Sequence, residues 1–198
     1  DADDMGVFYM GRDPSEQGNV IRHNFFHHNG NDHGRTCVVY FDDDACGTLV
    51  EGNIFWQNKG NPVWMNGGCD HVFTNNVFVD NPGTVPAGRD KRNYDWKTDA
   101  LQHPRLREVL DITTPPYSEK YPRLLEAYNN NSGLGRGNDV FRNMSVRSGG
   151  FGGGSNAVAD NWIADQDPGF ANPAAGDFTL TDVAAVREKV PGFEDIPF

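Results

Sequence analysis

The sequence has little cysteine, few basic residues and no long hydrophobic run. Its 198 residues include three cysteines, and 17 Lys and Arg stand against 28 Asp and Glu, which gives a formal net charge of −11. No apolar run approaches the about 18 residues that a membrane-spanning helix needs. Binding to phosphate groups requires Lys and Arg gathered on one face, so this acidic balance argues against a nucleic-acid or anionic-membrane partner.

The cysteines do not form the framework of a small disulfide-rich protein. Cys37, Cys46 and Cys69 are too few and too irregularly spaced, and none belongs to a CxxC motif. Cys37 opens an expected strand and Cys69 precedes another, where a small buried thiol packs well. We therefore expect stacked core cysteines, with a bridge between Cys37 and Cys46 as the alternative in an oxidising compartment.

One short phrase is repeated along the chain instead. It consists of an apolar pair, a polar spacer, an Asn and further apolar residues. The copies lie at residues 20–26, 49–55 and 72–78, with looser ones at 140–144 and 158–162. An internal repeat outranks arguments from local propensity, and this one predicts a solenoid.

The repeat has a second part, because a short apolar run precedes each clear copy, at residues 7–10, 38–41 and 63–65. A coil therefore contains about three short strands. Val7, Val38 and Val63 are 31 and 25 residues apart, which suits one turn of a right-handed parallel β-helix with coils stacked about 4.8 Å apart. The repeated Asn suits a coil corner, where it takes a left-handed conformation and bonds to the Asn above and below. Asn residues in the turns of a β-sandwich are the alternative.

The expected organisation is one all-β domain with an insertion. We expect β-helix coils over 1–87, a helical insertion with helices around 98–110 and 118–128, and final coils with a C-terminal cap over 136–198. The insertion as a whole covers 88–135. A short strand at 176–180 and a brief helix at 182–189 would cover the last coil.

The first coil, by contrast, would have uncovered strand edges. We therefore expect a C-terminal part of a longer protein, whose N-terminal coils come from the same or a companion chain and whose signal peptide lies upstream.

Acidic residues gather at the ends of neighbouring strands. Asp4 precedes the first strand, and Asp42, Asp43 and Asp44 end the equivalent strand one coil later. Two carboxylates that face one substrate can act as acid and as nucleophile or base, because crowding raises one pKa and leaves the other group ionised. Equivalent positions on neighbouring coils give the about 5 Å of retaining glycosidases, and a sideways offset gives the about 6.5–9.5 Å of inverting ones. Alternatively, the Asp42–Asp44 trio caps a turn or binds a structural Ca²⁺.

Aromatic residues accompany the acids. In the 31-residue register Tyr9 stacks on Tyr40, and strand alternation turns both outward beside Asp42, a surface suited to a sugar ring. Trp96 adds a second platform, whereas alternation assigns Trp64 to the core. The same register stacks Arg12 on the next residue, Asp43.

Four histidines fall between His23 and His33. They lack an HxH pattern, which argues against a zinc site, and His27 or His28 is better suited to donate a hydrogen bond or to shuttle a proton. The residues expected to contact substrate are therefore Tyr9, Arg12, His27, His28, Tyr40, Asp44 and Trp96.

Several stretches resemble the right-handed, pectate-lyase-like β-helix proteins of bacterial polysaccharide degradation. They lie at 4–13, 18–27 and 39–43, and similar ones at 115–122, 167–170 and 176–178. Within that group the chain most resembles glycoside hydrolases with α-L-fucosidase or xylanase activity, which use paired aspartates on neighbouring coils. The resemblance implies a pair formed by Asp4 with Asp42 or Asp43, and a plant, algal or microbial poly- or oligosaccharide as substrate. A secreted or periplasmic location and no required cofactor accompany it, with Ca²⁺ as an optional ion.

Two rival functions remain open. In a Ca²⁺-assisted polysaccharide lyase, Arg12 beside the acids would be the base, although an acidic face repels a polyuronate. In a carbohydrate-binding solenoid without catalysis, the aromatic residues alone would hold the sugar.

Overall fold

The computed structural model describes residues 3–31, 36–88, 95–130, 137–154 and 156–197, and it confirms a parallel β-helix. Three parallel sheets run along the solenoid. Sheet A contains β1 (Met5–Gly11), β4 (Thr36–Asp42) and β7 (Asn61–Met65). Sheet B contains β2 (Asn19–Arg22), β5 (Thr48–Glu51), β8 (Val72–Thr74), β10 (Asp139–Phe141) and β12 (Ala157–Ala159). Sheet C contains β3 (Phe25–His27), β6 (Ile54–Trp56), β9 (Val77–Val79), β11 (Met144–Val146) and β13 (Trp162–Ala164). Coil one is β1–β3, coil two β4–β6 and coil three β7–β9, while β10–β11 and β12–β13 form coils four and five.

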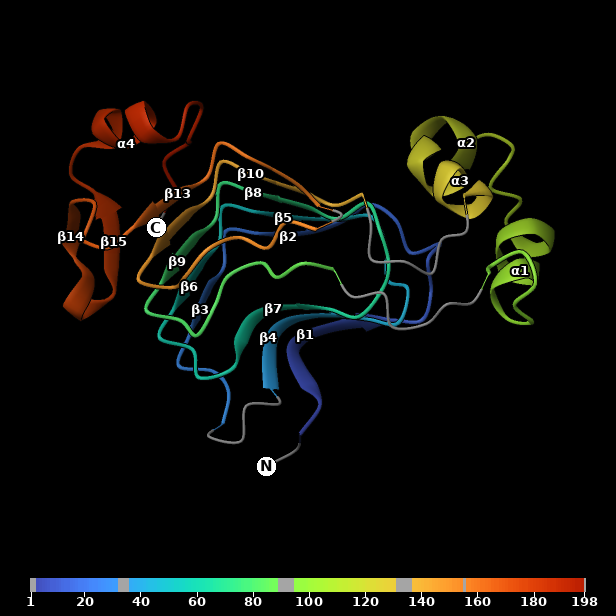
Figure 1. Ribbon diagram of the computed structural model, residues 1–198, viewed down its shortest axis with the longest axis horizontal. Coiled ribbons are helices and arrows are strands. Elements are labelled where there is room, and N and C mark those ends of the chain that lie inside the picture. Colours follow the sequence, from blue (N-terminus) through green and yellow to red (C-terminus); the bar gives the residue numbers. More distant parts are fainter. Residues whose placement is uncertain (1–2, 32–35, 89–94, 131–136, 155, 198) are drawn as a thin grey trace.

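The helices and the C-terminal tail lie on opposite flanks of these sheets (Figure 1). The insertion holds α1 (Gln102–Pro104), the π-helix η1 (Arg105–Val109), α2 (Tyr117–Lys120) and α3 (Pro122–Asn129). These match the two helical patterns of the sequence. The tail holds β14 (Phe170–Asn172), the 3-10 helix η2 (Pro173–Ala175), β15 (Asp177–Leu180) and α4 (Val183–Lys189). In the described ranges no helix has the length and apolar character to cross a membrane.

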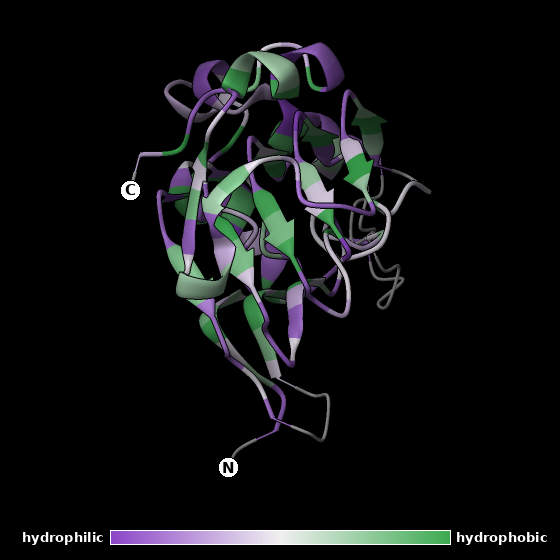
Figure 2. Cartoon of the chain, turned by 90° about the vertical axis from the view of Figure 1, so that its left-hand side faces the viewer, coloured by the Kyte–Doolittle hydropathy of each residue, from purple (hydrophilic) through white to green (hydrophobic). Residues whose placement is uncertain are grey.

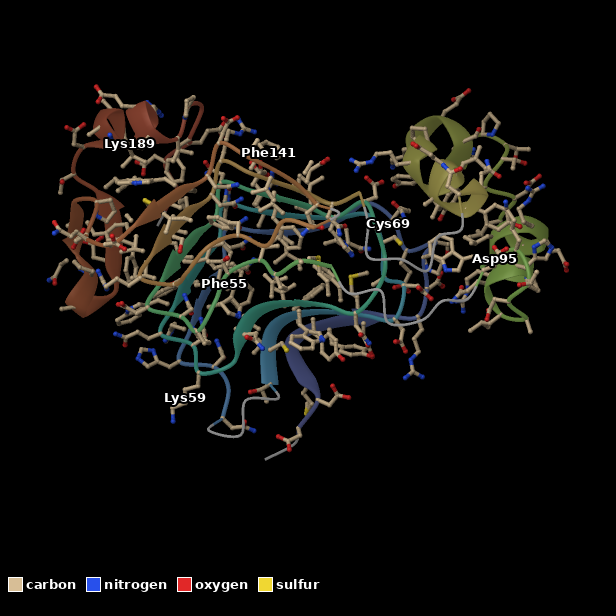
Figure 3. The ribbon with its side chains drawn as sticks, in the orientation of Figure 1. Phe55, Lys59, Cys69, Asp95, Phe141 and Lys189 are labelled. Atoms are coloured by element: carbon tan, nitrogen blue, oxygen red, sulfur yellow. The ribbon has the colours of Figure 1, made fainter. Side chains whose placement is uncertain are left out.

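The core is built from columns of residues that point inward at the same position of successive coils. Alternation along each strand turns hydrophobic residues to one side and polar ones to the other (Figure 2). In sheet C, Phe55 lies between Phe26 and Phe78, with ring centroids 5.1 and 4.7 Å apart, and it points into the solenoid (Figure 3). These stacked rings are buried without polar atoms, which supplies much of the hydrophobic driving force.

The register between coils one and two is the one expected from the 31-residue spacing: Tyr9 pairs with Tyr40 and Gly11 with Asp42. Between coils two and three the prediction was wrong by one residue. Tyr40 pairs with Trp64 and Val39 with Val63, whereas the sequence suggested Val38 opposite Val63. A slip of one residue moves every side chain to the other face of a strand, so Trp64 lies half-buried in the outward row of Tyr9 and Tyr40 instead of in the core.

The repeated Asn residues form hydrogen-bonded ladders along the solenoid. Each side-chain amide donates to the side-chain oxygen of the Asn on the next coil, at 2.9–3.0 Å. The first ladder consists of Asn24, Asn53, Asn76, Asn143 and Asn161, and the second of Asn29, Asn58, Asn81 and Ser148. The left-handed conformation, however, belongs to the residue before each of these, such as His23 (φ 55°) and Asn75 (φ 56°). That residue makes the corner, which turns the following Asn inward to the strand carbonyls.

We predict that breaking the first ladder at its centre destabilises the whole solenoid. Asn76 is fully buried, and its amide donates to the carbonyls of Val50 and Thr74 as well as to Asn143. Asn76→Ala leaves these buried groups without partners and should lower the free energy of unfolding by about 2–4 kcal/mol. Denaturant unfolding measures this loss. The partly exposed first rung provides the control, because Asn24→Ala should cost about 1 kcal/mol or less; equal costs at the two rungs would contradict the ladder's role.

The C-terminal tail covers the outer face of sheet C. Phe178 contacts the rings of Phe25 and Trp56 in coils one and two, at 5.9 and 5.4 Å, and Asn75 exchanges hydrogen bonds with the backbone of Glu194 at 2.9 and 2.7 Å. The expected cap over the last coil therefore lies elsewhere, along the flank. In that coil, the inward columns end in Val158 and Ile163, which are 40% and 56% exposed.

His71 is a fully buried histidine that serves the fold. Its Nε2 lies 2.8 Å from the carbonyl oxygen of Ala45, its Nδ1 accepts from the backbone N–H of Thr48 at 3.3 Å, and its ring stacks on Phe41 at 4.1 Å. A neutral ring protonated on Nε2 satisfies both bonds. Burial lowers the pKa of His71 from 6.5 to about 4, so this side chain stays neutral in the folded protein.

This burial predicts a specific loss of stability in acid. Below pH 6.5 the unfolded chain takes up a proton at His71 that the folded protein refuses until about pH 4. The contribution is therefore fully present above pH 6.5, falls as the pH drops, and amounts to about 3 kcal/mol by pH 4. Unfolding free energies of the wild type and His71→Gln, measured between pH 7 and pH 4, should converge with a difference in slope of this size. Parallel curves would contradict the assignment.

Candidate functional site

A bulge in sheet A brings two acids onto one amide. Phe41 pairs with Met65, 24 residues on, but Leu49 pairs with Val72, 23 residues on. The spacing changes at Asn66, so this residue of coil three faces both Asp42 and Asp43 of coil two. Its Nδ2 donates to Asp42 Oδ1 at 2.9 Å and to Asp43 Oδ1 at 3.2 Å. Neighbouring residues of a regular strand would point to opposite faces, and the bulge overrides this alternation.

Asp42 is almost buried yet well supplied with donors. It is 8% exposed, and besides Asn66 it accepts a hydrogen bond from the Tyr9 hydroxyl at 2.7 Å on Oδ2. Burial acts to raise the pKa of Asp42, but the hydrogen bonds from Asn66, Tyr9 and Tyr40 outweigh it and bring the pKa below its usual value. The carboxylate is therefore ionised at neutral pH.

Asp4 lies on the same outer face of sheet A. It is an exposed residue with a left-handed φ of 59° just before β1, and its Oδ1 accepts from the Tyr40 hydroxyl at 3.1 Å. The same hydroxyl is within hydrogen-bond reach of Asp42. Two oxygens bonded to a common hydroxyl lie at most about 6 Å apart, so Asp4 and Asp42, 38 residues apart in the sequence, are close neighbours.

The two tyrosines stay neutral and act as donors. Burial, followed by the hydrogen bond to Asp42, raises the pKa of Tyr9 to about 12. Burial, with the carboxylates of Asp42 and Asp4, raises the pKa of Tyr40 further. Tyr9 remains 48% exposed, whereas Tyr40 is 5% exposed, so the Tyr40 ring cannot serve as the sugar platform expected of it.

Arg12 forms the positive rim of the site. Its Nε lies 3.3 Å from Asp43 Oδ2, and its side chain is 68% exposed while that of Asp43 is 3% exposed. Its backbone carbonyl accepts from Gln102 Nε2 at 3.1 Å and from an Arg105 guanidinium nitrogen at 2.7 Å, and Arg105 pairs with Asp13 at 3.1 Å. The insertion thus holds the loop that carries Arg12.

Other expected site residues lie elsewhere. Trp96 is completely buried beside Leu106 in the apolar cluster of the insertion, so the prediction of a second sugar platform is wrong. Asp44 is 1% exposed, too buried to contact a substrate.

The histidines lie on another sheet. His27 and His28 follow β3 in sheet C, with their Nδ1 atoms 3.0 Å apart, and the His28 ring is 4.9 Å from that of Trp56. The fourth histidine, His33, lies outside the described residues. Within the residues that the structure describes, no three His, Cys, Asp or Glu side chains are arranged to hold a metal ion.

Sequence reasoning missed Asn66 altogether. The only signal was the difference between a 24-residue and a 23-residue spacing on its two sides, which requires the pairing to be known. Trp64 was missed for the same reason.

A family model described as the right handed beta helix region matches residues 4–85, which include β1 to β9. Neither the curated proteins nor the solved structures gave a match. The parallel sheets and this match define the class: the chain is a right-handed parallel β-helix, a fold compatible with enzymes and binding proteins that act on carbohydrates.

We predict that Tyr9 sets the ionisation of Asp42. Tyr9→Phe removes the 2.7 Å hydrogen bond to Oδ2, and because that bond favours the charged form, the pKa of Asp42 should rise. An NMR titration with ¹³C-labelled aspartate measures the change. Tyr128→Phe is the matched control, since that hydroxyl contacts His103 in the insertion. An unchanged Asp42 titration in Tyr9→Phe would contradict the prediction.

Proposed function

We propose that the protein is a glycoside hydrolase that acts on a plant, algal or microbial polysaccharide, with Asp4 and Asp42 as its catalytic pair. The observation that carries the proposal is the Tyr40 hydroxyl, which reaches both carboxylates on one outer face. Carboxylates from neighbouring coils that face one substrate are the requirement for glycoside hydrolysis by acid with nucleophile or base.

The environments of the acids support a division of roles. Asp42 keeps a lowered pKa and suits the ionised nucleophile or base, and exposed Asp4 then supplies the proton to the leaving group. Asp43 is less suitable than Asp42, because it is 3% exposed and its carboxylate is paired with Arg12. A separation of at most about 6 Å is nearer to the about 5–5.5 Å of retaining enzymes than to the wider gap of inverting ones.

The rim offers contacts for a sugar chain. The Tyr9 ring and the Arg12 guanidinium are the more exposed neighbours of Asp42 and Asp43, and Trp64 extends the aromatic row by one coil. We propose that these three bind the saccharide, that no cofactor is required, and that the enzyme works in secreted or periplasmic form.

The test measures hydrolysis with xylan and 4-nitrophenyl α-L-fucoside. Asp42→Asn and Asp4→Asn should each lower kcat/KM by about 10²–10⁴-fold, because each removes one partner of the acid–base pair. Asp160→Asn is the matched control: this exposed residue has a φ of 51°, which Asn accepts, and lies at the far end of the solenoid. Its activity should equal that of the wild type.

Two results would replace the proposal. Unsaturated-sugar absorbance with polygalacturonate, dependent on Ca²⁺ and Arg12, would identify a lyase. Glycan binding that Asp4→Asn and Asp42→Asn leave unchanged, without turnover of any glycan, would identify a binding solenoid.

A further inference from the structure

Cys46 and Cys69 occupy the same position on successive coils. They are 23 residues apart, the spacing at which Leu49 pairs with Val72, and the backbone N–H of Gly47 donates to the Cys69 carbonyl at 3.0 Å. Neighbouring coils at such positions are about 4.8 Å apart, inside the about 4.4–6.8 Å range between the Cα atoms of a disulfide. Their Sγ atoms are 3.4 Å apart.

From this juxtaposition we propose that Cys46 and Cys69 form a disulfide that links coils two and three. The free thiols of the structure are its reduced form. The alternative bridge from Cys37 to Cys46 does not fit, because the extended strand between Cys37 and Asp42 separates its ends by about 16 Å. Cys37 pairs with Asn61 on the next coil and has no cysteine there.

The reaction is a thiol–disulfide exchange with a disulfide donor, such as oxidised glutathione. A thiolate of the pair attacks the donor, which releases one reduced donor thiol and leaves a mixed disulfide. The second cysteine then attacks the Sγ of the first and expels the other donor thiol. The two protein thiols lose two protons and two electrons, and the donor disulfide gains them.

The surroundings determine when this happens. Cys46 is fully buried, Cys69 is 6% exposed, and both lie in the apolar cluster with Trp96, Leu106 and Leu124 of the insertion. Cys69 lies at the edge of the solenoid that faces the helices (Figure 3). Burial and the neighbouring Cys69 also keep the pKa of Cys46 well above its usual value, so the folded thiols react slowly. Oxidation therefore belongs to folding, before the insertion closes over the pair.

The bridge would also stiffen the candidate site. Cys46 comes three residues after Asp43, and Cys69 three residues after Asn66. A covalent link at this point fixes the turn with the acids against the turn with their shared amide donor. The inference does not rest on hydrolase activity, and its test uses none.

The experiment refolds the full chain with oxidised glutathione, denatures it without reductant and alkylates it with N-ethylmaleimide. We expect one adduct, on Cys37, and a linked peptide pair that contains Cys46 and Cys69. Reduction before alkylation should give adducts on all three cysteines. Three adducts without reduction would overturn the proposal, as would a linked pair that contains Cys37.

Single-cysteine variants give the test a second, independent readout. Cys37→Ser should keep the bridge and show no adduct before reduction, whereas Cys46→Ser should show two. The oxidised wild type and Cys37→Ser should melt about 5–10 °C higher than their reduced forms, and Cys46→Ser should show no such shift. The alkylation is read on denatured chains, so it holds even where a variant folds poorly.

Discussion

The amide-to-amide hydrogen bonds of the Asn ladders are the interaction on which this fold depends. Each buried Asn satisfies the amide of the coil before it, the amide of the coil after it and two strand carbonyls. These bonds close only when the coils are stacked in one register, since a buried amide without a partner costs about 1–3 kcal/mol. Short strands of three residues could slip against one another, and the ladders prevent it.

The candidate site arises where this regular stacking is interrupted. The ladders impose a spacing of 23 residues between coils two and three, while the strands of sheet A pair at 24. The extra residue is absorbed at the Asp42–Asp43 bulge, at the cost of burying two carboxylates. Asn66, Tyr9 and Arg12 offset that cost with a shared amide, a hydroxyl and a guanidinium. A structural irregularity thereby places ionised oxygen atoms on the outer face beside Asp4.

Much of the fold could be predicted from the sequence, because the repeat records the coils directly. The ladders, the pairing of Tyr9 with Tyr40 and the two helical patterns of the insertion all follow from spacing and periodicity. The pairing of coil three could not be predicted, since the 25-residue interval between the apolar runs differs by one residue from the true register. That single residue decides whether Trp64 faces outward and whether Asn66 meets the acids. Trp96 was misjudged for another reason: its burial depends on helices that are remote in the sequence and pack against the coil edge.

The tail's position changes how the molecule is expected to unfold. In a simple solenoid each coil touches only its neighbours, and coils can unravel one at a time. Here, Phe178 packs against coils one and two, and the backbone of Glu194 bonds to coil three, so one segment holds several coils at once like a strap. Loosening any of these coils also loosens the strap from the others. The long-range coupling this creates favours a single cooperative transition over stepwise peeling from an end.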